Sequence, residues 1–113
     1  MNIGTVCKEV KLYCDENGNE PIKHWLQKLD KSYRRIIDSR MARLLLGNYG
    51  DYKRINKDIF ELRFQIGSGY RVYFAEEGDI IVLLLCGGDK KTQKRDIEKA
   101  IKYYERYRRI KND

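Results

Sequence analysis

The stretch IFELRFQIGSGYRVYFA, residues 59–75, decides the fold, because its side chains alternate between two faces on either side of a glycine-rich turn. One face collects large apolar side chains: Phe60, Leu62, Phe64, Ile66, Tyr70, Val72 and Phe74. This period of two is typical of β-strands with one face on the core. The Gly-Ser-Gly between the two runs is typical of a hairpin. Residues 59–66 and 70–75 are therefore predicted to form antiparallel strands.

The opposite face of this hairpin carries Arg63, Arg71 and Tyr73. Cross-strand neighbours on one face lie roughly 5–8 Å apart, so the three side chains could converge on one phosphate. We expect this face to be open and free of balancing acids. The alternative is a solvated face on which Arg63 pairs with Glu61 or with acids of the following turn.

The rest of the chain supplies one more strand at each end and three helices. Residues 5–13 alternate loosely and predict a first strand. Pro21 suits the start of a helix, and Asp30 or Ser32 can cap a second helix that stops at Gly47. The inward stripe of that second helix is expected to comprise Tyr33, Ile36, Ile37, Met41, Leu44 and Leu45. The apolar run 80–86 predicts a strand covered on both faces, and a last helix begins near Thr92.

This β-α-α-β-β-β-α order predicts a single α+β domain over residues 1–113. The first two helices share a very short connection and are expected to form a helical hairpin. We expect the helices to group on one face of a small, mostly antiparallel, four-stranded sheet.

The charge of the chain favours an anionic partner. Its 24 Lys and Arg residues exceed its 17 Asp and Glu residues and give a net charge of +7. Residues 1–30 and 72–88 are net negative, so the positive excess is concentrated elsewhere. Nucleic acid, an acidic protein or a membrane surface would fit such a balance. No apolar stretch is long enough for a membrane span, and no signal peptide is apparent.

Cysteine and histidine usage argues against a metal site or a cofactor. Three cysteines without CxxC spacing (Cys7, Cys14 and Cys86) are expected to be reduced cytoplasmic thiols. A single histidine, His24, makes a zinc site unexpected. The stretch CGGDKKT fails the P-loop pattern, because Asp89 precedes Lys90 and residue 85 is leucine. We therefore expect no metal and no cofactor.

Lysine, arginine and tyrosine remain as the candidate catalytic groups. Such groups suit metal-free RNA cleavage, in which the 2′-OH of the substrate attacks the adjacent phosphate. A lysine with a lowered pKa can accept the 2′ proton, and arginine can stabilise the charge on the phosphorane.

Four blocks of the sequence resemble a known family. They are NEPIKHWLQKLD (19–30), RLLLGNYGDYKRI (43–55), FELRFQIGSGYRVYF (60–74) and LLLCGGDKKTQKRDIEKA (83–100). In this order they resemble the phage-derived addiction-module killer proteins, which are HigB-like toxins of the RelE/ParE superfamily. The resemblance extends from about residue 10 to residue 105.

The resemblance implies a small α+β toxin with a cognate antitoxin, usually of the helix-turn-helix type. It implies cleavage of mRNA in the A site of the 30S ribosomal subunit and, as the alternative, poisoning of DNA gyrase as in the ParE branch. A further alternative is an inactive toxin fold that only binds its antitoxin or RNA. The expected catalytic residues are Lys53, Arg63, Arg71, Tyr73 and Lys90. The expected RNA-binding residues are Arg54, Lys57, Lys91 and Lys94.

Overall fold

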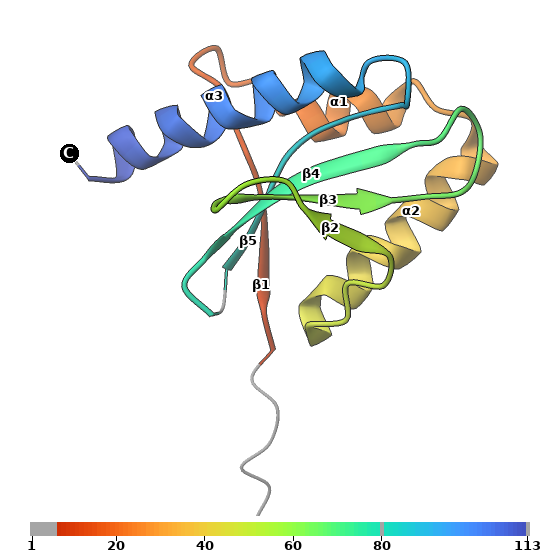
Figure 1. Ribbon diagram of the computed structural model, residues 1–113, viewed down its shortest axis with the longest axis horizontal. Coiled ribbons are helices and arrows are strands. Elements are labelled where there is room, and N and C mark those ends of the chain that lie inside the picture. The colour runs from red at the N-terminus through yellow and green to blue at the C-terminus, as the bar shows by residue number, and fades with distance from the viewer. Residues whose placement is uncertain (1–6, 80, 113) are drawn as a thin grey trace, which may run out of the picture.

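The computed structural model describes residues 7–79 and 81–112 and shows an α+β fold (Figure 1). Its elements in chain order are β1 (Glu9–Leu12), α1 (Pro21–Gln27), α2 (Lys31–Arg43), the 3-10 helix η1 (Leu44–Leu46), β2 (Tyr52–Arg54), β3 (Ile59–Arg63), β4 (Arg71–Glu77), β5 (Ile81–Gly88) and α3 (Gln93–Lys111). The predicted element order is confirmed, with β2 added. Part of the predicted first strand, residues 5 and 6, lies outside the described residues.

The sheet has five strands in the order β1-β5-β4-β3-β2. β1 pairs with β5 in parallel, and the other pairs are antiparallel. The expectation of four mostly antiparallel strands is therefore slightly wrong. The additional strand β2 covers three exposed residues, Tyr-Lys-Arg, which show no apolar alternation. Its pairing with β3 defines it as a strand, because its own sequence carries no strand pattern.

Helices cover both faces of the sheet, which corrects the expectation that they group on one face. The predicted α1–α2 hairpin packs on one face, where Ile22 and Ile37 belong to the same core cluster as Phe60 and Phe74 on the apolar side of the β3–β4 hairpin. Helix α3 packs on the other face, where Ala100 lies against Tyr73 and Leu83. The predicted two-sided burial of the β5 run is thus confirmed.

The second predicted helix, which forms α2 and η1, differs from the prediction in its inward stripe and in its N-cap. Ile37 and Leu44 are buried, but Ile36 and Leu45 are exposed. Asp30 occupies the N-cap position, where its carboxylate accepts a hydrogen bond from the Ser32 hydroxyl, and no side chain caps the helix backbone. Gly47, with φ of 75°, ends η1 in the left-handed conformation that glycine adopts without a Cβ penalty.

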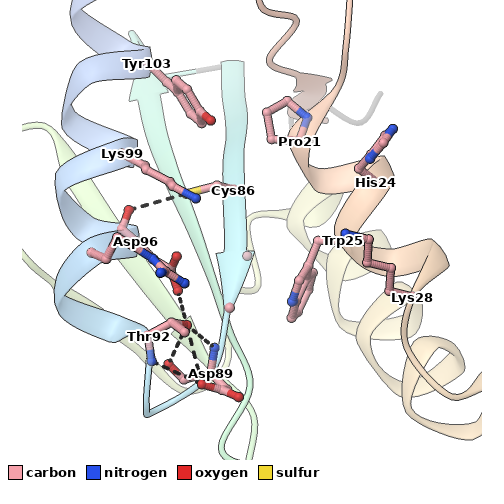
Figure 2. A pocket seen from close by; sticks show the side chains of 13 residues that line it. Pro21, His24, Trp25, Lys28, Cys86, Asp89, Thr92, Asp96, Lys99 and Tyr103 are labelled. Atoms are coloured by element: carbon pink, nitrogen blue, oxygen red, sulfur yellow. Dashed lines mark hydrogen bonds between the residues drawn. The ribbon is translucent and has the colours of Figure 1, made fainter.

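The end of β5 packs closely between α1 on one side and α3 on the other. A Cβ added to Gly87 would overlap the indole of Trp25 on α1, and one added to Gly88 would overlap the carboxylate of Asp96 on α3. Figure 2 shows Trp25 and Asp96 on opposite sides of this strand. The two glycines therefore allow α1 and α3 to approach the sheet, in addition to easing the turn into α3.

Within the described part of the chain, no helix is both long enough and apolar enough to span a bilayer. Cys86 is buried in the core below α3, and burial raises the pKa of its thiol to about 12.

Candidate active site

The candidate site lies on the face of the sheet that α3 only partly covers. Two cross-strand rows cross this face, with Arg63 opposite Arg71 in one row and Glu61 opposite Tyr73 in the next. The first turn of α3 contacts the second row through Gln93. The arginine row lies beyond this contact, so Arg63 and Arg71 stay partly exposed while Glu61 and Tyr73 are buried.

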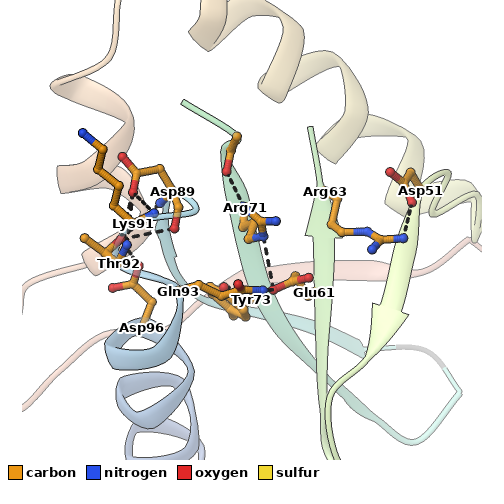
Figure 3. Close-up of polar contacts among 11 residues, drawn as sticks. Asp51, Glu61, Arg63, Arg71, Tyr73, Asp89, Lys91, Thr92, Gln93 and Asp96 are labelled. Carbon is orange, nitrogen blue, oxygen red and sulfur yellow. Dashed lines mark hydrogen bonds and ion pairs between the residues drawn. The ribbon is translucent and has the colours of Figure 1, made fainter. Parts of the chain in front are cut away.

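The Arg71 guanidinium is held from two sides (Figure 3). Its Nε lies 3.5 Å from Oε2 of Glu61, and its Nη1 donates to the carbonyl oxygen of Gly69 at 2.7 Å. Glu61 is only 1% exposed, so this carboxylate has little water around it. A buried carboxylate below the guanidinium fixes its position more strongly than a surface ion pair would.

Tyr73 and Gln93 complete the environment of Glu61. The Tyr73 hydroxyl donates to Oε2 of Glu61 at 3.0 Å, and the Gln93 amide donates to the same oxygen at 2.8 Å. The prediction that Tyr73 stands on an open face is wrong, because α3 covers it and its exposure is 0%. Burial, followed by the negative charge of Glu61, raises the pKa of Tyr73. The phenol is therefore protonated and holds Glu61, and it is not placed to contact a substrate.

Arg63 is the more open of the two arginines. Its Nη2 lies 3.0 Å from Oδ1 of Asp51, and both side chains are about two-fifths exposed. With Glu61 beside Arg71 and Asp51 beside Arg63, the expectation of a face without balancing acids is wrong. Arg40 of α2 supports the same strand end, because its guanidinium donates to the Arg63 carbonyl at 2.7 Å and lies over the Phe64 ring.

The loop after β5 brings Lys90 to the arginines. The Lys90 amide donates to the Ser68 carbonyl at 3.3 Å, and the Ser68 hydroxyl donates to Asp89 at 2.8 Å, so this loop is tied to the hairpin turn. Asp89 also accepts hydrogen bonds from the amides of Lys91 and Thr92. The Ser68 hydrogen bond, aided by these amides, lowers the pKa of Asp89.

Arg63, Arg71 and Lys90 share one cavity of about 340 Å³. Its other described lining residues are Phe64, Gln65, Gly69 and Tyr70, so no carboxylate lines it. Asp51 and Glu61 hold the arginines from outside this lining. Three cations around an acid-free cavity are suited to binding a phosphate group, because arginine offers a planar fork of donors and lysine a mobile charge.

Comparison with known proteins identifies the family. The profile of the family described as phage-derived protein Gp49-like (DUF891) matches residues 24–108. The chain belongs to the Gp49-like family. An uncharacterized protein of Haemophilus influenzae is 49% identical to it over 77 residues, which are 67% of this chain and 78% of that protein.

The fold of this Gp49-like protein is that of RelE. A free-state structure of a mutant of the Escherichia coli toxin RelE superimposes with a TM-score of 0.62 at 16% identity. The match covers 85% of this chain and 96% of the RelE chain. The RelE-like α+β fold that the sequence resemblance implied is confirmed.

The remaining predicted residues of the Gp49-like chain do not gather at the cavity. Lys53 is exposed on β2 opposite Glu61, next to the arginine row without lining the cavity. Arg54 points to the other face, where it lies over the Phe60 ring at 4.6 Å and donates to the carbonyl of the exposed Lys57.

The two adjacent lysines of the β5–α3 loop separate. Lys90 lines the arginine cavity, whereas Lys91 lines a shallow hollow of about 290 Å³ with Lys94 and Arg95 of α3. Figure 3 shows the Lys91 side chain directed away from Arg71. Of the two lysines, Lys90 is therefore the one beside the arginines.

Sequence reasoning missed three residues that organise this site. Glu61 appeared only as a possible surface partner of Arg63, although its alternation already placed it on the arginine face. Asp51 and Gln93 gave no local signal, because they reach the site through β2 pairing and through the first turn of α3.

Proposed function

We propose that this protein is the toxin of a toxin–antitoxin pair and that it cleaves mRNA on the ribosome. The observation that carries the proposal is the acid-free cavity in which Arg63, Arg71 and Lys90 converge. The family and the RelE-like fold support the assignment as a toxin. The net charge of +7 supports RNA as the target.

The proposed reaction is an internal transesterification of RNA. The 2′ oxygen next to the scissile phosphate forms a bond to phosphorus, and the bond from phosphorus to the 5′ oxygen breaks. The 2′ proton passes to a base, and the departing 5′ oxygen receives a proton from an acid. The products carry a 2′,3′-cyclic phosphate and a 5′-hydroxyl group.

The side chains divide this work according to their position. Arg71, held by Glu61 and Gly69, binds the scissile phosphate together with Arg63 and stabilises the charge on the phosphorane. Lys90 lies within the same cavity and is the best-placed group for proton transfer, with Lys53 as the second candidate. Tyr73 acts as a positioning residue for Glu61 and does not touch the RNA.

The cations outside the cavity contribute to RNA binding but take no part in the proposed cleavage reaction. Arg54, Lys57, Lys91 and Lys94 lie outside the cavity and are exposed. They add long-range attraction to the phosphates of mRNA and rRNA. The proposed partners are the 30S A site carrying mRNA, and a cognate antitoxin of the helix-turn-helix type that blocks the toxin.

Mapping mRNA 5′ ends after induced expression tests the proposal. New 5′-hydroxyl ends in translated mRNA, dependent on ribosomes in a purified system, are expected for the wild-type protein and not for Arg71→Ala. Double-strand DNA breaks without new mRNA ends would instead indicate a gyrase poison. Unaffected growth would indicate an inactive binding module. Full toxicity after joint replacement of Arg63, Arg71 and Lys90 would overturn the proposed mechanism.

A further inference from the structure

A second pocket, of about 430 Å³, lies between α1 and α3 at the end of β5 (Figure 2). The proposed chemistry does not use it. Its floor is formed by Cys86, Gly87 and Gly88, and its walls come from the two helices. It is larger than the arginine cavity and lies on the other side of the β5–α3 loop.

The floor of this pocket is a strand edge without a neighbour in the described part of the sheet. β1 pairs with β5 only from Ile81 to Leu84, whereas β5 continues to Gly88 with β4 on its other side. An unpaired edge presents backbone N–H and C=O groups to whatever lies beside it. The pocket therefore offers backbone hydrogen-bonding groups to a ligand.

Basic side chains from both sides surround the pocket. His24 of α1 and Lys28, the C-cap residue of α1, line one wall, and Arg95 and Lys99 of α3 line the other. The ion pairs found within 4.0 Å over residues 7–79 and 81–112 include none of these four side chains. This arrangement leaves positive charge on facing walls, which suits an anionic ligand.

The two carboxylates in the pocket wall are already engaged. Asp89 accepts hydrogen bonds from Ser68 and from the loop amides, and Asp96, which is 4% exposed, accepts one from the Thr92 hydroxyl. They organise the start of α3 and leave the lysines and the arginine available to a ligand.

An aromatic surface accompanies these charges. The indole of Trp25 rests against Gly87, and Tyr103 lines the opposite wall. Aromatic rings beside basic side chains are the combination that binds single-stranded nucleic acid, because the ring stacks on a base while the cations hold the phosphates.

A single loop joins this pocket to the arginine cavity. Asp89 lines the pocket, and the next residue, Lys90, lines the cavity. We propose that the pocket is a second subsite for the RNA and binds a nucleotide that flanks the scissile phosphate. The strand crosses the Asp89–Lys90 loop, with a base against Trp25 and phosphates on Lys28 and Lys99. This inference rests on the proposed function, because it assumes the same RNA strand.

Trp25 makes the test specific, because it is the single tryptophan of the chain and it lines the pocket. The probe is a short single-stranded RNA that is 2′-O-methylated at every ribose and cannot be cleaved by 2′-OH attack. Titration of the full chain at low salt is expected to give a saturable decrease in Trp25 fluorescence. Anisotropy of a labelled copy of the same RNA reports total binding.

Two matched double variants decide the role of the pocket. Lys28→Ala/Lys99→Ala is expected to weaken RNA binding by about tenfold and to abolish the fluorescence change. Lys23→Ala/Lys102→Ala removes the same charge from exposed positions of the same two helices outside the pocket and is expected to weaken binding by less than about twofold. Circular dichroism confirms that both variants are folded.

The proposal is overturned by absence of RNA binding, by binding without a change in Trp25 fluorescence, or by equal weakening in the two double variants. These outcomes are separable from failure of the proposed function. If the protein cleaves mRNA but Trp25 fluorescence does not change with RNA, only the proposal of a second subsite is refuted. If Trp25 fluorescence changes with RNA but mRNA on ribosomes stays intact, the pocket is an RNA-binding site and the proposed nuclease activity is refuted.

Discussion

The buried carboxylate of Glu61 lies 3.5 Å from Nε of Arg71, directly below the guanidinium that we assign to the scissile phosphate. Tyr73 and Gln93 hold the same carboxylate oxygen from the far side. Arg71 is thus connected through one buried anion to the start of α3, so the candidate site and the α3 packing depend on each other.

Glu61→Gln is expected to destabilise the protein strongly. The change removes the negative charge beside Arg71 and leaves a mostly buried cation without its partner, which costs about 3 kcal/mol in free energy of unfolding. The midpoint of urea unfolding measures this loss. Tyr73→Phe is the comparison: it removes one hydrogen bond to Glu61 and should cost about 1 kcal/mol. Equal stability of Glu61→Gln and wild type would contradict the assigned ion pair.

Arg71→Lys is expected to reduce ribosome-dependent cleavage by about tenfold or more, and Arg71→Ala by about a hundredfold. A lysine cannot contact Gly69, Glu61 and a phosphate together, because it lacks the planar fork of arginine. Single-turnover cleavage of mRNA on programmed ribosomes gives the rates. Arg109→Lys, an exposed change near the end of α3, serves as the control and should cleave at the wild-type rate. A fully active Arg71→Lys protein would exclude bidentate binding.

Gly88→Ala is expected to destabilise the fold by about 3 kcal/mol, since the added methyl group overlaps the Asp96 carboxylate and forces α3 away from β5. Gly18→Ala is the matched control. Gly18 has φ of 83° with open space around it, so alanine there adds only backbone strain of about 1 kcal/mol. Thermal and urea unfolding compare the two variants. A smaller loss at Gly88 than at Gly18 would show that the contact with α3 is looser than described.

Asp89→Asn is expected to change how stability depends on acid pH. Hydrogen bonds from Ser68 and the loop amides hold the pKa of Asp89 below its unfolded value of about 3.9. The native state therefore binds fewer protons than the unfolded state, so this contribution is present above about pH 4 and is lost as pH falls through the lower native pKa. Urea midpoints measured from neutral to acid pH should fall less steeply for the variant than for wild type. If the urea midpoints of the two proteins fall in parallel with pH, the loop does not stabilise the charged form of Asp89.

The hairpin and the faces of its side chains could be predicted from sequence because a period of two is a local signal. Side chains that alternate between two faces on either side of the glycine-rich turn placed Phe60 and Phe74 on the core side, and both are buried there. The same alternation placed Arg63 and Arg71 together, and the register pairs them directly.

The coverage of the arginine face could not be predicted in the same way. The sequence predicted a last helix from about Thr92, but it did not show on which side of the sheet that helix packs. Burial of Tyr73 depends on that choice, because α3 lies over Tyr73 and stops short of Arg71. Asp51 joins the site only through β2, whose three exposed residues form a strand by pairing with β3.

The parallel pairing of β1 with β5 has a consequence for the order in which the chain can fold. Glu9 pairs with Ile81, so the first strand waits for a partner that is synthesised late, while the β3–β4 hairpin closes through near neighbours. Contacts so distant in sequence slow folding, because a long loop must close before they form. Since β5 also leads into the loop that carries Lys90, a nascent chain cannot assemble the arginine cavity until most of the protein has left the ribosome.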